Sequence, residues 1–349
     1  MNTPWGYPDF DAHDAPHFVT DEKSGLRAII AMHSTHLGPA AGGTRFWHYP
    51  DDAEGLTDAL RLSRGMSYKN AMAGLPLGGG KAVVLANRSC TKTPEMLAAF
   101  GAAVNSLGGK YVTAEDVGMS VSDMIEISKQ TKFVAGLPVA GGAVGGDPGP
   151  HTSLGVFLGI KAAVKLALGK DSVDGLHIAL QGAGSVAGGV ARQAAAEGAR
   201  LSIADVDRAR AEKLAAETGG TVVAPDDILY LEADVVSPCA LGAILTEQSI
   251  ARLNTPVVAG GAHNQLATAE DGQRLQARGI LYAPDYVINA GGIINLSTQS
   301  LGDGGPELGR SRIEAIPGRL EQIWADSVAT GRDPASVADA MAQKLIGRA

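Results

Sequence analysis

The sequence predicts an α/β protein with two domains, and three observations support this prediction. The chain has 349 residues, which is more than one hydrophobic core usually serves. Hydrophobic residues make up 45% of the chain, so each domain has enough apolar side chains to bury. Patterns typical of strands and of helices alternate along the chain, as they do where helices connect parallel strands. We therefore expect two parallel-sheet domains with a cleft between them.

The first half of the chain alternates between short apolar runs and longer helical patterns. Pro94 stands at the first turn of one such pattern, the preferred place for proline in a helix. The three glycines before Lys81 predict a turn that leads into a strand. In order, we expect a strand at 26–32, a helix at 52–69, a strand at 82–86, a helix at 94–107, a strand at 110–113 and a helix at 120–129.

A glycine- and proline-rich stretch at 135–151 separates the two halves and predicts a hinge. Thr152 then caps a helix that runs to about residue 168. Beyond it we expect strands at 176–181, 201–205, 233–236, 256–259 and 280–282, and helices at 185–197, 290–300, 310–329 and 334–346.

Composition limits the classes of function. The net charge is −8 and no basic stripe is present, which argues against nucleic acid as a partner. No apolar run has the length and character of a membrane span, and the first residues do not read as a signal peptide. Cys90 and Cys239 lie far apart, which fits a reducing compartment, and no Cys/His cluster has zinc spacing. We expect a cytoplasmic protein without a metal.

A glycine motif predicts a dinucleotide site in the second domain. Gly182-x-Gly184-x-x-Ala187 stands between a predicted strand and a predicted helix, where the backbone approaches a pyrophosphate closely. Asp205 follows 23 residues after Gly182, where a carboxylate binds the adenosine ribose. This context predicts a doubly wound Rossmann domain, although an α/β crossover with a glycine turn gives a similar pattern. Asp205 favours NAD, while Arg208 and Arg210 leave NADP open.

Two lysines and an acidic pair form the second constellation. Lys69 and Lys81 are twelve residues apart, and Glu115 and Asp116 follow a predicted strand. Two cations in one pocket suit an anionic substrate, and a neighbouring cation lowers the pKa of a lysine toward neutrality. The alternatives are two solvated surface lysines and a structural lysine–carboxylate ion pair.

Together these segments resemble the leucine/phenylalanine/valine dehydrogenase branch of the glutamate dehydrogenase superfamily. The similarity runs in family order from about residue 26 to residue 300. It is carried by 37–45 (LGPAAGGTR), 65–70 (GMSYKN), 78–81 (GGGK), 113–118 (TAEDVG), 181–187 (QGAGSVA), 237–242 (SPCALG) and 284–292 (PDYVINAGG).

The resemblance implies an architecture and a reaction. Residues 1–137 would form a substrate and oligomerisation domain to which 328–349 return, and residues 138–327 would form the Rossmann NAD-binding domain. The reaction would be the reversible oxidative deamination of an apolar L-amino acid, branched-chain or aromatic, to a 2-oxo acid and ammonia, with NAD as cofactor. The protein would be a homo-oligomer.

The resemblance also assigns roles to residues. Lys69 would hold the substrate carboxylate with the Gly42 and Gly43 backbone, Lys81 would activate water, and Asp116 would relay protons. The side-chain pocket would be lined by Ala41, Ala114, Ile293 and Leu296, whose apolar character disfavours glutamate. The cofactor residues would be Arg45, Thr152, Gly182, Ala183, Gly184, Ser185, Val186, Ala187, Asp205, Val206, Cys239, Ala240 and Asn289.

One loop departs from the family pattern. Residues 261–266 read Gly-Ala-His263-Asn264-Gln-Leu, whereas the family usually carries two asparagines at 263 and 264. In the family this loop contacts substrate and cofactor, and histidine titrates near neutral pH. His263 therefore keeps an atypical amino substrate open as an alternative. A non-catalytic dinucleotide-binding protein with the same fold is a further alternative, against which the intact Lys69, Lys81 and Asp116 count.

Overall fold

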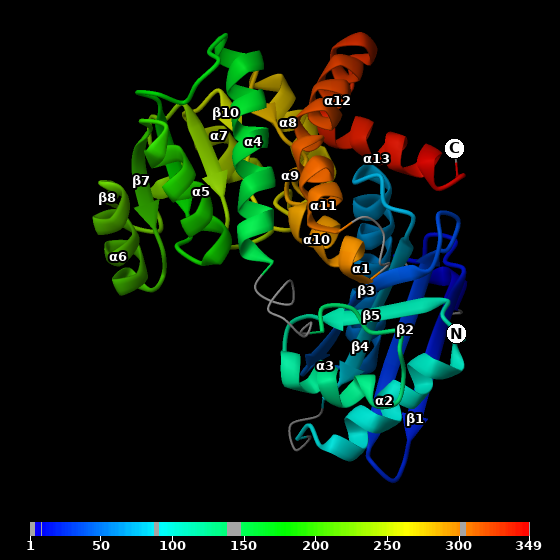
Figure 1. Ribbon diagram of the computed structural model, residues 1–349. Coiled ribbons are helices and arrows are strands. Elements are labelled where there is room, and N and C mark those ends of the chain that lie inside the picture. Colours follow the sequence, from blue (N-terminus) through cyan, green and yellow to red (C-terminus); the bar gives the residue numbers. More distant parts are fainter. Residues whose placement is uncertain (1–3, 8, 87–90, 138–147, 301–304, 349) are drawn as a thin grey trace. The chain divides into compact units, whose positions relative to one another are not determined.

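The computed structural model describes residues 4–7, 9–86, 91–137, 148–300 and 305–348, and it divides the chain into two compact units (Figure 1). Unit 1 consists of Met1–Gly146, Leu296–Gly305 and Ala342–Ala349. Unit 2 consists of Asp147–Asn295 and Pro306–Met341. The last return to unit 1 thus begins at Ala342, whereas the sequence suggested residue 328. Most of the hinge expected at 135–151, and also Cys90, lies outside the described residues.

Unit 1 is built on a mixed five-stranded sheet in the order β1-β2-β4-β3-β5. β1 and β2 are antiparallel, β2 and β4 are antiparallel, and β4, β3 and β5 run parallel to one another. The strands are β1 (Ala15–Asp21), β2 (Leu26–Ser34), β3 (Ala40–Trp47), β4 (Gly78–Leu85) and β5 (Tyr111–Glu115). The helices are η1 (Pro4–Gly6), α1 (Asp52–Met72), α2 (Pro94–Ser106) and α3 (Val121–Ser128).

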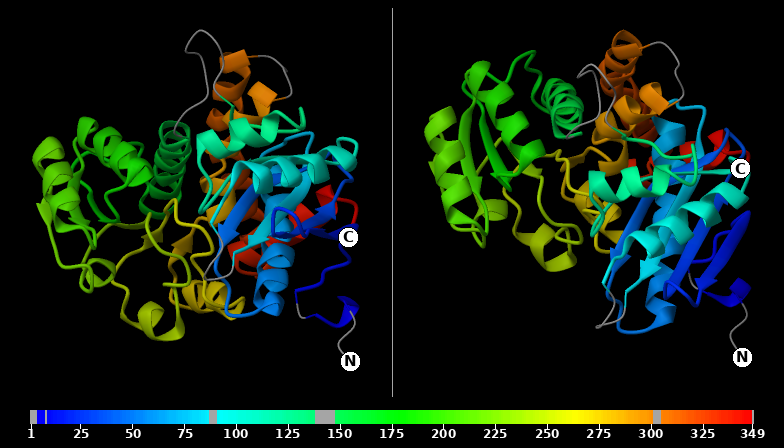
Figure 2. Two further views of the ribbon diagram at one scale, coloured as in Figure 1. Left: turned by 90° about the horizontal axis from the view of Figure 1, so that it is seen from below. Right: turned by 60° about the horizontal axis from the view of Figure 1, so that its bottom comes forward.

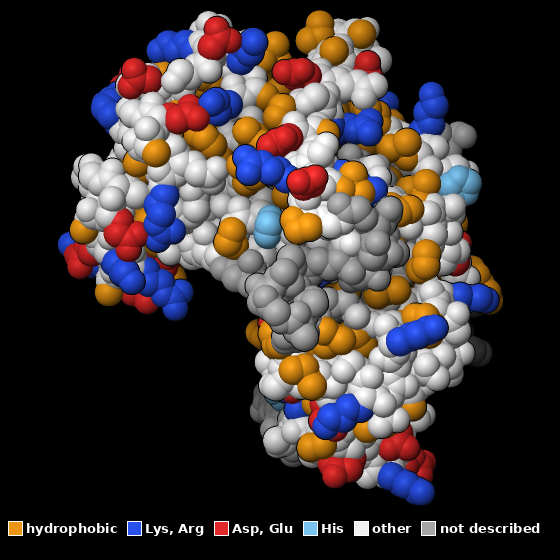
Figure 3. Space-filling view, viewed as in Figure 1, with side chains coloured by type: hydrophobic (Ala, Val, Ile, Leu, Met, Phe, Trp, Pro, Cys, Tyr) orange, Lys and Arg blue, Asp and Glu red, His pale blue; other side chains and the backbone are white. Residues whose placement is uncertain are grey.

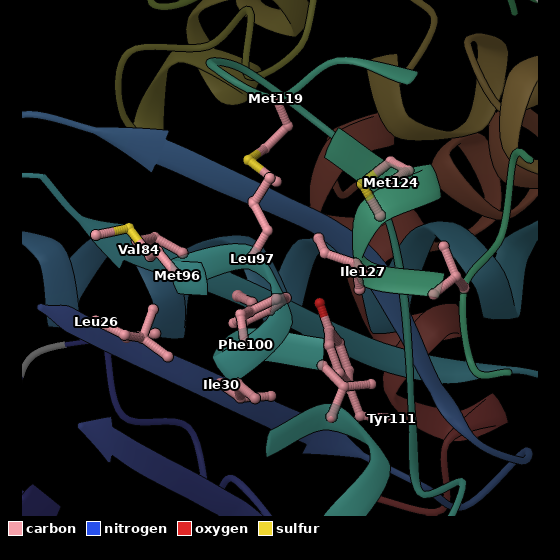
Figure 4. Packing of buried hydrophobic residues seen from close by; sticks show 14 of the residues in the cluster. Leu26, Ile30, Val84, Met96, Leu97, Phe100, Tyr111, Met119, Met124 and Ile127 are labelled. Atoms are coloured by element: carbon pink, nitrogen blue, oxygen red, sulfur yellow. The ribbon is translucent and has the colours of Figure 1, made fainter. Parts of the chain in front are cut away.

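The sheet of unit 1 is covered by helices on both faces, because β2 and β4 are apolar on both. Leu26, Ile30 and Val84 pack against Phe100 of α2 and Ile127 of α3 (Figure 4). On the opposite face, the intervening residues Ile29, Ala31 and Val83 pack against α1 through Leu56, Ala59 and Leu60. This period-two alternation decides which strand residues face α1, and it therefore decides where the polar residues of β3 and β4 lie.

Unit 2 is a parallel six-stranded sheet in the order β11-β10-β9-β6-β7-β8, the order of a doubly wound dinucleotide-binding domain. The strands are β6 (His177–Gln181), β7 (Arg200–Ala204), β8 (Thr221–Val222), β9 (Val235–Pro238), β10 (Val257–Val258) and β11 (Leu281–Tyr282). The two-domain α/β fold predicted from the sequence is confirmed, and unit 2 has the Rossmann topology.

Helices lie on both faces of the unit 2 sheet (Figure 2). The helices that connect its strands are α5 (Ser185–Ala196), α6 (Arg208–Thr218), η2 (Ile228–Tyr230), α7 (Glu247–Arg252) and α8 (Glu270–Ala277). The remaining helices are α4 (Gly149–Leu168), α9 (Asp285–Ile288), α10 (Gly291–Ser300), α11 (Gly305–Glu314), α12 (Ile316–Thr330) and α13 (Pro334–Leu345).

Among the described residues, α4 alone is long and apolar enough to cross a membrane by length and composition. In unit 2 it packs against α5 and α12. Val156, Ile160 and Val164 on its inner side are fully buried. Its apolar composition is therefore that of a core helix.

Three local expectations were wrong. Thr152 does not cap a helix, because α4 begins at Gly149 and Thr152 donates its hydroxyl hydrogen bond to the Pro148 carbonyl one turn back. The glycines before Lys81 belong to strand β4 rather than to a turn. The single helix expected at 310–329 is two helices, α11 and α12, that meet near Ala315.

Candidate active site

The register of β3 and β4 carries two basic side chains to the face that α1 covers. On β4, Val83 packs under α1, so Lys81 two residues earlier points to the same face. On β3, Arg45 is the register partner of Val83 and shares that face. Helix α1 begins with its amino-terminal Asp51 cap and runs over these strands.

Lys81 and Asp116 form a buried ion pair. The Lys81 side chain is 8% exposed, and its Nζ lies 2.7 Å from Oδ2 of Asp116, which directly follows β5. Arg45 places its Nε 3.1 Å from the same Oδ2. The carboxylate of Asp116 therefore receives two cations on one oxygen.

The line of charges continues beyond Arg45. Nη1 of Arg45 donates to Oδ2 of Asp58 at 2.8 Å, and Asp58 comes from α1. The hydroxyl of Tyr49 donates to that same oxygen of Asp58. Lys81, Asp116, Arg45 and Asp58 thus alternate in sign, and Tyr49 ends the line.

The charges around Lys81 shift three pKa values. Burial lowers the pKa of Lys81 below its ordinary value, Asp116 opposes this, and Arg45 adds to the lowering. Burial alone would raise the pKa of Asp116, but Lys81 and Arg45 outweigh it and hold that pKa below its usual range. Burial alone would lower the pKa of Arg45, but the charges of Asp116 and Asp58 outweigh it and raise that pKa. Burial was expected from the sequence as a cause of the lowered Lys81 pKa, whereas the contribution of Arg45 was not.

Lys69 lies near the end of α1 and is 9% exposed. The next residue, Asn70, donates from Nδ2 to the Gly78 carbonyl at 2.7 Å, which ties this turn of α1 to the start of β4. The structure thus brings both lysines into unit 1, on two elements that contact each other.

Glycines at 42 and 43 are required by close packing. A Cβ atom on Gly42 would lie 1.8 Å from the Gly80 carbonyl oxygen. A Cβ atom on Gly43 would lie 2.8 Å from the Cβ atom of Asp116. Gly43 therefore leaves the space that the Asp116 side chain occupies beside β3.

The residues expected to line a side-chain pocket divide between the units. Ala41 on β3 and Ala114 on β5 are buried in unit 1. Leu296 is counted with unit 1, where a Cβ atom on Gly136 would lie 3.4 Å from its Cδ2. Ile293 is half-buried near the start of α10, in unit 2.

In unit 2 the glycine motif lies at the carboxyl end of β6. Gly182 has φ of +107°, a conformation that favours glycine, and a Cβ atom there would lie 3.2 Å from that of Ala240. A Cβ atom on Gly184 would meet nothing within 4 Å, so open space lies over the motif where α5 begins at Ser185. Within α5, Val186 is half-buried and Ala187 is buried.

Asp205 stands at the end of β7, beside the glycine motif. Its Oδ2 accepts from the backbone N–H of Ala183 at 2.7 Å, which fixes the carboxylate against the turn. Val206 follows with 88% exposure. Arg208 pairs with Glu212 and Arg210 pairs with Asp207, so both arginines already have carboxylate partners. Figure 3 shows acidic and basic side chains intermixed where Figure 1 places α6.

The ends of β9 and β10 and the start of α10 complete this edge. Sγ of Cys239 accepts from the Gly261 N–H at 3.3 Å, and burial raises the pKa of this thiol, as expected for a packing residue. Nδ2 of Asn289 donates to the Gly261 carbonyl at 3.2 Å and lies 3.1 Å from Nδ1 of His263. Asn264 follows with φ of +51°, a left-handed conformation that asparagine tolerates.

Thr152 lies beside the glycine pair at the start of α10. A Cβ atom on Gly292 would lie 2.8 Å from Oγ1 of Thr152, and one on Gly291 would lie 3.0 Å from its backbone nitrogen. The small residues after Asn289 therefore allow α4 and α10 to approach closely.

The unit 2 edge fits a nicotinamide dinucleotide. Two buried acceptors there, Oε1 of Gln181 and Oδ1 of Asn289, have no hydrogen-bond partner in the described part of the chain. An unpartnered buried acceptor is costly, and a bound ligand that donates to it removes the cost. The helix terminus, the open space over Gly184 and the Asp205 carboxylate provide what a pyrophosphate and a ribose require.

Within the described residues, no group of three or more metal-ligating side chains occurs.

Sequence reasoning missed Asp58 and Tyr49 and gave Arg45 only a cofactor role. Asp58 lies between Leu56 and Ala59, which face the sheet. A carboxylate beside the apolar stripe of a helix was a signal that an ionic partner lies under that helix.

Comparison with known proteins places this site in a family. Residues 15–133 match the family model described as "Glu/Leu/Phe/Val dehydrogenase, dimerisation domain". Residues 201–300 match that described as "Glutamate/Leucine/Phenylalanine/Valine dehydrogenase". The first match lies in unit 1, and residues 201–295 of the second lie in unit 2. Together the two matches include both lysine elements and Asp205.

Individual relatives agree with the family match. The chain is 44% identical to leucine dehydrogenase of Bacillus subtilis (strain 168) over 331 residues, 95% of this chain and 90% of the relative. It is 45% identical to L-tryptophan dehydrogenase of Nostoc punctiforme (strain ATCC 29133 / PCC 73102) over 291 residues, 83% of this chain and 81% of the relative.

A solved structure of L-tryptophan dehydrogenase from Nostoc punctiforme superposes with a TM-score of 0.85 at 40% identity and covers 96% of both chains. The resemblance drawn from the sequence motifs is confirmed. The chain belongs to the glutamate/leucine/phenylalanine/valine dehydrogenase family, and it is an amino acid dehydrogenase.

Proposed function

We propose that this enzyme catalyses the reversible NAD-dependent oxidative deamination of an apolar L-amino acid to a 2-oxo acid and ammonia. The buried 2.7 Å contact between Lys81 and Asp116 carries this proposal. A lysine whose pKa is lowered by burial, held against an ionised carboxylate, is the arrangement that a general base requires.

The chain's own residues then have definite tasks. A bound nicotinamide would supply the hydride acceptor for the substrate Cα. Lys81 in its neutral form takes a proton from the water that attacks the iminium carbon of the substrate. The Asp116 carboxylate stabilises the cationic iminium and passes protons onward. Lys69, with the Gly42 and Gly43 backbone, holds the substrate carboxylate.

The cofactor is NAD rather than NADP. The Asp205 carboxylate disfavours the 2′-phosphate that distinguishes NADP. Arg208 and Arg210, which the sequence left open as partners for that phosphate, are engaged by Glu212 and Asp207. The remaining proposed cofactor contacts are Arg45, Thr152, Gly182, Ala183, Gly184, Ser185, Val186, Ala187, Val206, Cys239, Ala240 and Asn289.

The substrate side chain is branched-chain or aromatic. Ala41, Ala114, Ile293 and Leu296, the residues proposed to meet it, offer no cation to a side-chain carboxylate. The relatives named above act on leucine and on tryptophan, according to their names. His263 and Asn264 are proposed to contact the substrate, with the His263 ring oriented by Asn289.

The enzyme works as a cytoplasmic homo-oligomer joined through unit 1. The family model that matches residues 15–133 is described as a dimerisation domain. Strand β1 is an edge of the unit 1 sheet, and Phe18 on it is 62% exposed. An edge strand with an exposed aromatic side chain is suited to pair with a second copy.

Replacing Lys81 by alanine tests the proposed base. We expect kcat for the preferred amino acid to fall by about a thousandfold or more, the range lost with a general base. NAD affinity, measured by fluorescence titration, should stay unchanged, because the glycine motif lies in unit 2. Lys129→Ala, which removes an exposed lysine of the same unit, is the control and should keep full activity. A Lys81→Ala enzyme with wild-type kcat would disprove the assignment.

A substrate panel separates the proposed reaction from its alternatives. The purified enzyme is assayed with leucine, phenylalanine, tryptophan, glutamate and non-standard amines, and NADH formation is followed by absorbance. We expect turnover with the apolar amino acids and none with glutamate. Turnover confined to a non-standard amine would instead favour the atypical substrate that His263 suggested.

A further inference from the structure

The Arg45 guanidinium is held from two sides. Its Nε contacts Asp116 at 3.1 Å, and its Nη1 contacts Asp58 at 2.8 Å. The side chains of Arg45, Asp116 and Asp58 are each 23% exposed, so their charges are partly shielded from water. Charge pairs in such surroundings interact more strongly than pairs in bulk solvent.

Asp58 is anchored independently of Arg45. It lies on α1 next to Ala59 and Leu60, which are buried under the sheet, so its backbone position is fixed. Tyr49 donates its hydroxyl to the Asp58 carboxylate, and burial raises the pKa of this phenol, which therefore remains a donor. The two anchors keep the carboxylate aimed at Arg45.

We propose that Asp58 is a positioning residue for the reaction: it shares the Arg45 guanidinium with the catalytic carboxylate of Asp116, so that Arg45 neutralises that carboxylate only in part. This inference rests on the proposed roles of Lys81 and Asp116. It makes Arg45 the cation that accompanies the catalytic pair, whatever contact Arg45 also makes with the cofactor.

Loss of Arg45 and loss of Asp58 should shift the pKa of Lys81 in opposite directions. The charged groups that act on Lys81 are Asp116 after β5, Arg45 on β3 and Asp58 on α1. Tyr49 after β3 and the buried Tyr111 of β5 are neutral donors, and Lys69 on α1 is a further buried lysine. Arg45 favours neutral Lys81, whereas Asp58 favours charged Lys81. Without the Asp58 charge, Asp116 is the one carboxylate that remains paired with Arg45 in this line of charges. Arg45 then neutralises the charge of Asp116 more fully.

The experiment measures the acid-side midpoint of kcat/KM against pH in Arg45→Gln and Asp58→Asn. We expect Arg45→Gln to move the midpoint upward by about half a pH unit or more, as loss of a nearby charge requires. Asp58→Asn should move it downward. Arg45→Lys, which keeps the charge, should stay closer to wild type than Arg45→Gln. Asp52→Asn removes an exposed carboxylate from the same helix and should leave the midpoint in place.

A second readout needs neither substrate nor cofactor. The titration of the Lys81 Cε signal is followed by NMR in enzyme with labelled lysine, assigned by its absence in Lys81→Ala. Opposite shifts in Arg45→Gln and Asp58→Asn support the inference. Shifts in the same direction, or no shift in either folded variant, overturn it. If wild type turns over no amino acid, the proposed function fails, and the NMR titration still decides the role of Asp58.

Discussion

The Asp116 carboxylate meets Lys81 and Arg45 on one oxygen, and this contact sets the chemistry at the residue scale. Because two cations hold its pKa below the usual range, Asp116 stays ionised throughout the neutral range. An ionised carboxylate beside Lys81 would by itself keep the lysine charged. Burial and Arg45 oppose that effect, so the lowered pKa of Lys81, on which its proposed role as a base depends, results from a balance among three side chains.

A second residue-scale prediction concerns the choice of dinucleotide. Asp205→Ser removes the carboxylate that we propose accepts from the adenosine ribose and repels a 2′-phosphate. We expect the Kd for NAD to rise by about tenfold or more, the value of one hydrogen bond to a charged group, while NADP binding improves. Fluorescence titration with both dinucleotides measures the ratio.

The control for Asp205 is another acidic residue of unit 2. Asp226→Ser removes an exposed carboxylate and should leave both affinities unchanged. An unaltered NADP-to-NAD ratio in Asp205→Ser would show that this carboxylate does not meet the ribose.

Where a motif indicates the chemistry, the sequence allows individual site residues to be proposed. Lys81, Asp116 and the glycine motif could be named because few other residue types serve at such positions. The partners of Arg45 could not be found in this way. Asp58 lies 13 residues from Arg45, and Asp116 lies 71 residues away, so their meeting depends on strand register and helix packing. Linear spacing does not encode that information.

At the scale of elements, the contact between α1 and β4 determines where both lysines lie. A Cβ atom on Gly79 would lie 2.0 Å from the backbone nitrogen of Ser67 and 2.2 Å from its hydroxyl oxygen. One on Gly80 would lie 2.8 Å from the Tyr111 ring. The glycine run thus brings a helix and a strand together, rather than loosening a turn.

Gly79→Ala should therefore separate α1 from β4. Because the obstructing atoms include the Ser67 backbone, we expect a loss of about 3 kcal/mol or more in the free energy of unfolding, at the upper end of overpacking effects. The same displacement should raise the KM for the amino acid, since Lys69 follows Ser67 on α1. Thermal unfolding and steady-state kinetics measure the two effects.

Gly65→Ala on the same helix is the matched control. A Cβ atom there meets nothing within 4 Å, so alanine should stabilise the helix by about 0.5–1 kcal/mol. Equal stability of Gly79→Ala and wild type would mean that β4 tolerates a side chain and that the close contact is not required.

The sequence missed strands β3 and β1, each for a physical reason. Strand β3 contains Gly42 and Gly43, which disfavour strands when considered alone, and tertiary packing overrides that preference. Strand β1 has only partly buried or exposed residues, so it lacks a clear apolar pattern. By contrast, β2 and β6 are mostly buried, and both were predicted within two residues of their ends.

At the scale of the whole molecule, the chain passes between the units at residues 146/147, 295/296, 305/306 and 341/342. Its last segment is tied to unit 1 through Arg348. The guanidinium donates to the carbonyls of Asp11, Ala12 and His33 at 2.5, 2.8 and 2.5 Å. Residues more than 300 positions apart in the sequence are therefore fixed together in one unit, a contact that no local pattern predicts.

His33 makes this tie sensitive to pH. It is fully buried, with Nδ1 2.8 Å from the Ser67 hydroxyl oxygen and Nε2 3.0 Å from the Asp11 carboxylate. Burial, with Arg348, lowers the pKa of His33 to about 4. An unfolded histidine has a pKa near 6.5, so the unfolded chain takes up the proton more readily than the folded protein. His33 therefore stabilises the fold above about pH 6.5, and this contribution is lost as the pH falls toward 4.

Acidification should thus weaken wild type more than a variant without this histidine. From pH 7.5 to pH 5 we expect His33 to account for a loss of about 2 kcal/mol, because the unfolded chain gains about 1.4 kcal/mol for each pH step of one below its histidine pKa. His33→Gln, although less stable at pH 7.5, should lose less on acidification because glutamine does not titrate. His36→Gln, which replaces an exposed histidine nearby, should follow wild type. Thermal midpoints across this pH range measure the effect, and an equal acid loss in His33→Gln and wild type would show that the buried imidazole is not its source.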